Sequence, residues 1–400
     1  MKNTSYEIKN NQIFIRLCGR IDSNNNKEIE EEIKSIISEE APMPLIFDAK
    51  ELEYISSAGL RIFLRLKKEN ENLSIINVNS DVYEIFDMTG FTQIMNIEKA
   101  YRVITVDGCE EIGRGANGKV YRIDQDNVVK VYNNPDALDE IKNEREVARK
   151  ALVLGIPTAI SYDVVKVGES YGSVFELLNA QSFSQILDSE KDKMDWCVDE
   201  YVKLLKKIHS TKVPDGELPD IRESVKDWIA FLEEYLPKEA YIKLNKLIED
   251  VPYDNHMLHG DFHTKNVEYV DGEVMIIDMD TLSVGHPVFE FAMMYNAFLG
   301  YNEYCHEDLK DFLGIDYETS EIFWNKVLAK YFETANSEKI KEVIEKANII
   351  SYVRMIRRHI RQNVHITDKG KVEVDGWTKK LIECLNNTET LLFDIDLIKD

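Results

Sequence analysis

The sequence predicts a small α/β domain followed by a larger α+β domain of two lobes, and three observations support this fold class. The chain has 400 residues, more than one hydrophobic core usually serves. Strand-like and helix-like runs alternate over residues 6–97, which is typical of helices packed on a sheet. After residue 100, hairpin-like strands precede long helical runs that begin near residue 183.

We place the domain boundary near Tyr101, where the pattern changes without a linker rich in Pro, Gly or Ser. The domains are then expected at residues 1–100 and 101–400. Within the second, a small lobe at about 101–180 precedes a helical lobe at about 181–400. The hydrophobic content of 44% is enough to give each domain a core.

In the first domain, apolar runs of strand length alternate with amphipathic helical periods. The expected strands are residues 13–17, 44–49 and 73–78, and the expected helices are residues 27–37, 57–68 and 82–88. Ser56 or Ser57 stands where a hydroxyl oxygen can cap the second of these helices.

In the second domain, the segments RVITVDG, KVYRI and VVKVY are rich in β-branched residues and predict antiparallel strands around turns. The last two are joined by the turn DQDN, so they are expected to form a hairpin. This hairpin would belong to the small lobe.

The chain carries 73 acidic and 49 basic side chains, a formal net charge of -24. Such a balance argues against binding to nucleic acid or to an anionic membrane surface, and favours neutral or cationic partners. Five cysteines lie far apart without a CxxC pair, so neither a disulfide framework nor a zinc site is indicated. No signal peptide or membrane-spanning run is visible, and we expect a cytoplasmic protein.

The segment EEIGRGANGKVYRI contains Gly113, Gly115, Gly118 and Val120 in G-x-G-x-x-G-x-V spacing. A dinucleotide-binding fold would need a helix directly after the glycines, whereas this sequence predicts a strand there. We therefore expect a hairpin that covers the phosphates of a nucleotide.

Lys130 lies between valines on the next predicted strand. A lysine in that place is either a surface residue or a phosphate ligand with a helical carboxylate as its partner. The following helical run offers Glu144 and Glu146, and we favour Glu146 from its distance to the turn at Gly155. Glu144 remains possible.

The segment MLHGDFHTKNVEYVDGEVMIIDMD is the most informative. Phosphoryl transfer needs a carboxylate beside the acceptor hydroxyl and oxygen ligands for magnesium. Asp261 would supply the first, and Asn266 and Asp278 the second. Each could serve only as a turn or strand terminator, but their order after a glycine loop and a strand lysine favours catalysis, and His259 would brace the loop.

From about Ile104 onward, these motifs resemble the aminoglycoside phosphotransferase and choline kinase superfamily, a branch of the protein-kinase-like fold. The resemblance implies ATP and Mg²⁺ as cofactors and a hinge at VFELL, where backbone from Glu176 to Leu178 would bind adenine. It also implies a small-molecule hydroxyl acceptor in the helical lobe. His286 and Glu290 depart from the family, in which acids are frequent at the first position and Asp is usual at the second.

The acceptor itself is not specified by any motif. Two segments, DSEKDKMDWCVDE and YNEYCHEDLKDFLGIDYE, combine acids and aromatics as a cationic amine or aminosugar would require. They are equally consistent with solvated helix faces, so a cationic acceptor is one of two interpretations.

The segment FDAKELEYISSAGLRIFLRLKK and the α/β alternation around it resemble the STAS domain of bacterial anti-sigma factor antagonists. In that family the serine two positions before the glycine is the phosphoacceptor, which implies Ser57 here, although Ser56 replaces the usual acid. A phosphate on Ser57 would face a helix N-terminus and block a partner on that surface.

Three functions follow as hypotheses. The first is an ATP- and Mg²⁺-dependent small-molecule kinase with a regulatory STAS module. The second is a signalling protein that binds a partner through its STAS surface and whose kinase fold senses nucleotide or phosphorylates a protein serine. The third, resistance to aminoglycosides, depends on fold analogy alone.

Overall fold

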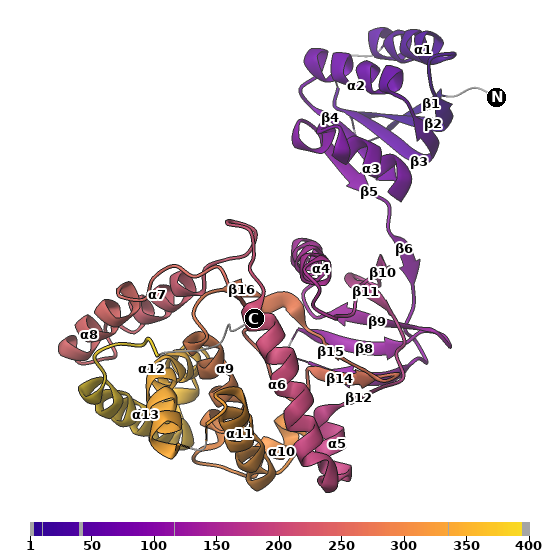
Figure 1. Ribbon diagram of the computed structural model, residues 1–400. Coiled ribbons are helices and arrows are strands. Elements are labelled where there is room, and N and C mark those ends of the chain that lie inside the picture. Colours follow the sequence, from indigo (N-terminus) through magenta and orange to yellow (C-terminus); the bar gives the residue numbers. More distant parts are fainter. Residues whose placement is uncertain (1–3, 10, 40–42, 116, 335, 394–400) are drawn as a thin grey trace. The chain divides into compact units, whose positions relative to one another are not determined.

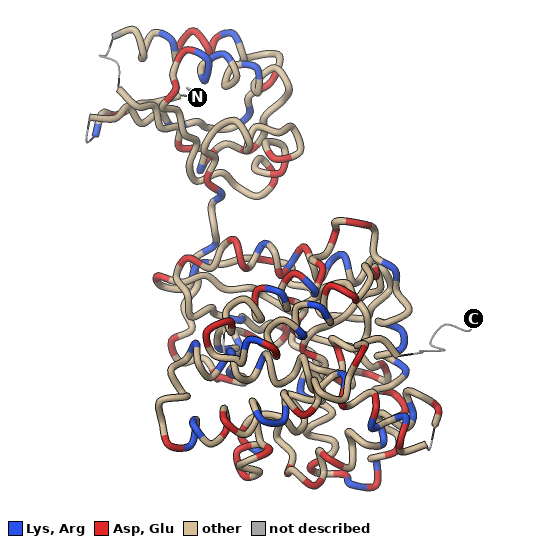
Figure 2. Tube along the Cα trace, turned by 90° about the vertical axis from the view of Figure 1, so that its left-hand side faces the viewer, with Lys and Arg blue, Asp and Glu red and all other residues tan. Residues whose placement is uncertain are grey.

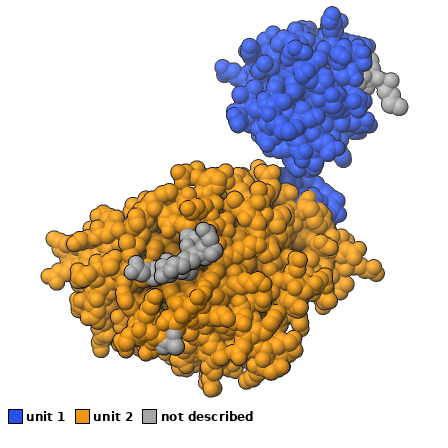
Figure 3. Space-filling model, viewed as in Figure 1, with its two compact units in different colours: residues 1–109, 131–135, 163–173 blue, residues 110–130, 136–162, 174–400 orange. Residues whose placement is uncertain are grey.

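The computed structural model describes residues 4–9, 11–39, 43–115, 117–334 and 336–393. These residues form two compact units, shown in different colours in Figure 3. The first comprises residues 1–109, 131–135 and 163–173, and the second comprises residues 110–130, 136–162 and 174–400. The predicted boundary at Tyr101 stays a prediction.

The N-terminal part is a five-stranded sheet with helices, as predicted (Figure 1). Strand order is β1-β2-β3-β4-β5; β1 is antiparallel to β2, and the other pairs are parallel. The elements are β1 (Thr4–Lys9), β2 (Gln12–Ile21), α1 (Asn26–Glu39), β3 (Leu45–Ile55), α2 (Ser57–Glu69), β4 (Leu73–Val78), α3 (Ser80–Met88) and β5 (Asn96–Lys99). Strand β1 was not anticipated from the sequence.

Helix α2 packs closely on the sheet because of Gly59. A Cβ atom at this position would lie 2.7 Å from Ile55 Cγ1 and 2.8 Å from Ile21 Cγ2. Real Cβ atoms do not approach side chains so closely, so a larger residue would push the helix away. Gly59 therefore sets the position of the helix N-terminus that carries Ser56 and Ser57.

A second sheet has six strands in the order β6-β10-β11-β9-β8-β7. Its elements are β6 (Arg102–Ile104), β7 (Glu110–Arg114), β8 (Gly118–Arg122), β9 (Asn127–Tyr132), α4 (Leu138–Val153), β10 (Asp163–Val167) and β11 (Ser170–Glu176). The expectation of antiparallel pairing for β6 is wrong, because β6 pairs in parallel with β10. A long connection that includes α4 separates these two strands, and such crossovers produce parallel pairs.

The rest of the chain is mainly helical, as expected from residue 183 onward (Figure 1). Its helices are α5 (Phe183–Ser189), α6 (Met194–Ser210), α7 (Ile221–Phe231), α8 (Lys238–Glu249), α9 (Val288–Phe298), α10 (Asp308–Leu313), α11 (Tyr317–Tyr331), α12 (Ser337–Arg361) and α13 (Asp368–Asn387). Short strands connect them: β12 (Ala180–Ser182), β13 (Met257–Leu258), β14 (Val267–Val270), β15 (Glu273–Ile276) and β16 (Ser283–Val284).

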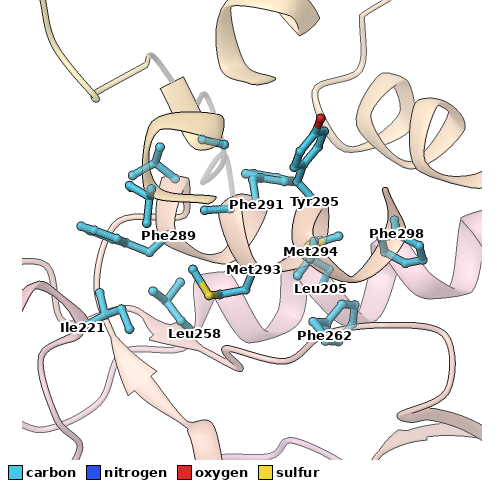
Figure 4. Close-up of a cluster of buried hydrophobic side chains, with 14 of the residues drawn as sticks. Leu205, Ile221, Leu258, Phe262, Phe289, Phe291, Met293, Met294, Tyr295 and Phe298 are labelled. Carbon is cyan, nitrogen blue, oxygen red and sulfur yellow. The ribbon is translucent and has the colours of Figure 1, made fainter. Parts of the chain in front are cut away.

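The core of this part surrounds α9, whose residues are all buried. Figure 4 shows side chains of α9 packed among Leu205, Leu258 and Phe262. Burial of so many large apolar groups is the main stabilising contribution here.

Acidic and basic side chains are interspersed along the chain (Figure 2). No helix in the described part of the chain is long and apolar enough to cross a bilayer.

Candidate active site

The glycine segment is a hairpin, as predicted. Strands β7 and β8 pair with Gly113 opposite Val120, and the Gly115 amide donates to the Gly118 carbonyl across the turn at 2.9 Å. Nothing lies within 4 Å of a Cβ atom built on Gly115, so the backbone there is open to a ligand. Since a strand and not a helix follows the glycines, the dinucleotide-fold alternative is excluded.

Lys130 on β9 joins three separate segments. Its Nζ lies 2.9 Å from Oε1 of Glu144 on α4 and 3.5 Å from Oδ1 of Asp278. The lysine side chain is 18% exposed, so both contacts are poorly screened by solvent. Two carboxylates thus hold the Lys130 side chain in one orientation.

The preference for Glu146 as the partner of Lys130 is wrong. Glu146 forms its ion pair with Lys150 at 3.0 Å, and its side chain is 59% exposed. Residues two apart on a helix point about 200° away from each other, so only one of Glu144 and Glu146 can face the strand lysine. The rotation of α4 about its own axis directs the Glu144 side chain toward Lys130.

Asp261 and Asn266 occupy one loop between β13 and β14. The Asn266 Nδ2 donates to the Asp261 carbonyl at 3.0 Å and reaches Asp261 Oδ2 at 3.4 Å. The Ile277 amide donates to the Asn266 carbonyl at 2.9 Å, which holds the loop beside the residue preceding Asp278. The structure therefore brings Asp261, Asn266 and Asp278 together.

The Asp261 carboxylate is strongly acidic. Burial opposes its ionisation, but a hydrogen bond and charge from His263, assisted by the charge of Arg354, lower the pKa of Asp261 to about 2. The carboxylate is 36% exposed and is ionised at neutral pH. It can accept a hydrogen bond from an acceptor hydroxyl.

The side chain of Glu290 on α9 holds the backbone of the loop that carries Asp261. The fully buried carboxylate accepts hydrogen bonds from the His259 amide and, at 3.0 Å, from the Gly260 amide. Gly260 has φ +81°, and a Cβ there would lie 2.7 Å from the Thr281 carbonyl oxygen. The sequence identified Glu290 only as a departure from the family pattern, not as a support of the loop.

His259 acts as a brace, as predicted. Its Nδ1 accepts a hydrogen bond from the Asp261 amide at 3.3 Å. Burial lowers the pKa of His259, so the imidazole is favoured in its neutral form. A neutral ring can accept this hydrogen bond, whereas an imidazolium cannot.

Asp280 is a site residue that sequence reasoning missed. The Nδ2 of Asn117, in the glycine turn, donates to Asp280 Oδ2 at 3.2 Å. Burial and the neighbouring charge of Asp278 raise the pKa of Asp280 to about 7. The signal was visible in the sequence, because Asp280 is the second acid of the I-D-x-D motif.

These residues fit a magnesium ion bound together with phosphates. No group of three His, Cys, Asp or Glu side chains in the described ranges could hold a metal alone. Asp278 and Asp280 repel each other, and a cation would relieve this repulsion. Carboxylate and amide oxygens suit Mg²⁺, which usually takes further ligands from phosphate and water.

The expected hinge follows β11. The Leu177 amide donates to the Asp126 carbonyl at 2.6 Å, whereas the Leu178 amide has no acceptor among the described residues. Leu178 is half-buried, and Glu176 is exposed. The Leu178 amide is therefore available to a base, and its role stays a prediction.

In the N-terminal domain, the two serines differ. The Ser56 side chain caps α2, accepting from the amides of Ala58 and Gly59 at 3.2 and 3.4 Å. Ser57 is the first helical residue and is exposed. Capping therefore falls to Ser56, and the role of Ser57 as phosphoacceptor stays a prediction.

The chain is similar to solved structures of aminoglycoside phosphotransferases. ADP-bound APH(2'')-Ib is 16% identical with a TM-score of 0.46, over 76% of this chain and 98% of that chain. The gentamicin complex of APH(2")-IIa is 16% identical with a TM-score of 0.43, over 75% and 95%. A thermostable mutant of APH(4)-Ia in its apo form is 12% identical with a TM-score of 0.48, over 70% and 94%.

Two family models match the sequence. The model described as the STAS domain matches residues 3–103. The model of the phosphotransferase enzyme family matches residues 108–319, more than half of the chain. The chain thus belongs to the phosphotransferase enzyme family and carries a STAS domain ahead of its phosphotransferase domain.

Proposed function

We propose that the protein is an ATP- and Mg²⁺-dependent kinase that phosphorylates a hydroxyl group of a small molecule, with its STAS domain as a regulatory or docking module. The observation that carries this proposal is the position of Lys130 between Glu144 and Asp278. A lysine so oriented can bind nucleotide phosphates next to the Asp261–Asn266 loop.

Each residue then has a role. The acceptor hydroxyl would donate a hydrogen bond to Asp261, which would take its proton as the hydroxyl oxygen bonds to the γ-phosphorus of ATP. The bond from that phosphorus to the β–γ bridging oxygen would break, and its electron pair would leave with ADP. Asn266, Asp278 and Asp280 would hold Mg²⁺, which neutralises phosphate charge when bound. The glycine hairpin and the Leu178 amide would bind phosphates and base.

Replacement of Asp261 by Asn tests this assignment. It removes the proton acceptor and keeps the side-chain size, so phosphotransfer should fall by roughly 10²- to 10⁴-fold. Nucleotide affinity, measured by calorimetry with Mg²⁺, should stay unchanged. Asp271→Asn is the matched control, because Asp271 lies exposed in the β14–β15 turn. Retained turnover in Asp261→Asn contradicts the proposal.

A second candidate function is phosphorylation of Ser57 by the protein itself. The exposure of Ser57, with capping performed by Ser56, leaves the Ser57 hydroxyl accessible. Intact-mass measurement after incubation with ATP and Mg²⁺ checks this candidate. One added phosphate that disappears in Ser57→Ala supports it, and an unmodified mass contradicts it.

A further inference from the structure

Helix α12 carries four arginines on one side: Arg354, Arg357, Arg358 and Arg361. Positions three and four apart on a helix are neighbours, so these side chains form a continuous stripe. Within the described ranges, ion pairs of arginine involve Arg16, Arg65, Arg102, Arg114 and Arg222, and none involves this stripe. In a chain with a net charge of -24, an unpaired row of arginines is unexpected.

Two members of the stripe lie over aromatic rings of α7. The Cζ of Arg354 lies 5.6 Å from the centroid of Trp228, and that of Arg357 lies 5.7 Å from the centroid of Phe231. Phe231 is 39% exposed, so this surface is open on one side. A guanidinium group that lies over a ring can still donate its remaining N–H groups to an anion.

Arg357 has a buried donor without an acceptor. Its Nε is shielded from solvent and has no hydrogen-bond partner among the described residues. Burial and the charges of Arg361 and Arg354 lower the pKa of Arg357, while Asp227 acts in the opposite direction without forming an ion pair. A buried unsatisfied donor is costly, and a rotation of the Arg357 side chain toward an anionic ligand would satisfy it.

The stripe lies beside the catalytic loop. Glu290 on α9 holds the amides of His259 and Gly260, and one turn further along α9 the sulfur of Met293 contacts the Arg354 guanidinium. The Ser351 hydroxyl donates to the Ala292 carbonyl at 2.8 Å and fixes α12 on α9. The charge of Arg354 also acts on the carboxylate of Asp261. Arg354 and the loop that carries Asp261 therefore contact the same helix, α9, and the charge of Arg354 reaches that carboxylate.

Several acids of the two segments that suggested a cationic acceptor form ion pairs with lysines of this protein. Asp195 pairs with Lys326 at 2.7 Å, and Asp199 pairs with Lys330 at 2.9 Å. In the second segment, Asp308 pairs with Lys369 at 2.6 Å, and Glu303 pairs with Lys380 at 2.6 Å. Asp195, Asp199 and Asp308 form surface ion pairs, which favours the interpretation as solvated helix faces for these three acids. The Glu303 side chain is only 6% exposed, and it also accepts hydrogen bonds from the hydroxyls of Tyr295 and Tyr352, so it serves the packing of the helices.

We propose that Arg354 and Arg357 bind an anionic group of the phosphoryl acceptor, which is a hydroxylated small molecule bearing a carboxylate or phosphate group. This inference rests on the proposed kinase function and names the substrate class of that site. Arginine pairs bind carboxylate and phosphate in bidentate geometry, and they repel an aminosugar. The rings of Trp228 and Phe231 would make apolar contacts with the carbon skeleton of the acceptor.

The first test measures binding without turnover. The full-length protein is saturated with ADP and Mg²⁺, so that the nucleotide site is blocked, and titrated calorimetrically. The probes are glucose, ribose and glycerol skeletons, each as phosphate, acid, neutral and amino derivative. We expect at least one phosphate or acid to bind about tenfold or more tightly than its neutral and amino counterparts. Failure of every anionic probe to bind overturns the proposal, as does preferential binding of an amine.

The second test uses variants. Arg354→Gln and Arg357→Gln should each weaken binding of the anionic probe by about tenfold to a hundredfold, whereas the Lys variants should lose less. Arg358→Gln is the control from the same stripe, because the Cζ of Arg358 lies 4.7 Å from the centroid of Tyr301 and not over a ring of α7. Equal binding by Arg354→Gln, Arg357→Gln and Arg358→Gln overturns the proposal. Unchanged ADP affinity confirms that the variants are folded.

The two proposals fail in different ways. A protein that binds the anion through Arg354 and Arg357 but transfers no phosphate contradicts the kinase function alone. A protein that phosphorylates a neutral sugar or an aminosugar equally well in Arg354→Gln, Arg357→Gln and the unmodified protein contradicts the anionic acceptor alone.

Discussion

Lys130 and Glu144 form an ion pair of 2.9 Å between strand β9 and helix α4. The pair is mostly buried, with exposed fractions of 18% and 14%, and it orients the lysine toward Asp278. Removal of one partner from such a pair leaves the other charge poorly compensated. The position of α4 is therefore coupled to the orientation of Lys130 in the proposed phosphate site.

Glu144→Gln should lower kcat/KM for ATP by about tenfold to a hundredfold, because the lysine loses its orienting charge. Steady-state kinetics at varied ATP checks this expectation. Glu146→Gln is the matched control on the same helix and should differ from the unmodified protein by less than about twofold, because an exposed i,i+4 pair contributes little. The opposite ranking of the two variants would restore Glu146 as the functional partner.

Glu290→Gln keeps the size of the side chain but removes the charge that binds the amides of His259 and Gly260. Charge-assisted hydrogen bonds are roughly twice as strong as neutral ones, so kcat should fall by about tenfold while KM for ATP changes little. Glu290→Asp should retain more activity, since it keeps the charge. A larger loss in Glu290→Asp than in Glu290→Gln would show that side-chain length, not charge, supports the loop.

Ser56→Ala should destabilise the N-terminus of α2 by about 0.5–2 kcal/mol, because the cap to Ala58 and Gly59 is lost. Ser57→Ala should have little effect, since Ser57 is exposed and already helical. All four tryptophans lie outside the STAS domain, so hydrogen–deuterium exchange of α2 peptides is the suitable measurement. Equal protection of α2 amides from exchange in Ser56→Ala and Ser57→Ala would contradict the assignment of capping to Ser56.

The pair Glu30–Arg65 should make stability of the STAS domain depend on acid pH. The hydrogen bond from Arg65, opposed by burial and assisted by Lys34, lowers the pKa of Glu30 to about 2. A carboxyl with a lowered pKa contributes stability above its unfolded value, and this contribution is lost as pH falls from about 4.5 to 2.

Arg65→Gln should therefore cost at most about 1 kcal/mol at neutral pH, because the arginine is half exposed, and nothing near pH 2. Hydrogen exchange of α1 and α2, compared at equal pH between variant and unmodified protein, measures this difference. Arg61→Gln, an exposed arginine on the same helix, is the control. A cost that grows as pH falls would contradict the assignment.

Much of the fold could be predicted because its signals are local. The alternation of apolar strands and amphipathic helices predicted the N-terminal sheet, and β4 has the predicted bounds, Leu73–Val78. Strand β1 was missed because Thr4–Lys9 is mostly exposed and lacks an apolar run. The parallel pairing of β6 was also missed, since it depends on a strand about sixty residues away.

The glycine hairpin, the strand lysine and the Asp261–Asn266–Asp278 series could be predicted from the sequence, because each motif depends on spacing within one short segment. Tertiary structure alone decided which carboxylate faces Lys130, since that depends on the rotation of α4. It also decided that Asn117 reaches Asp280 and that Glu290 supports the loop that carries Asp261. The placement of Arg354 and Arg357 over α7 likewise required packing of helices more than a hundred residues apart in the chain. Side chains distant in sequence meet through the packing of whole helices and strands, so the spacing of residues along the chain does not predict such contacts.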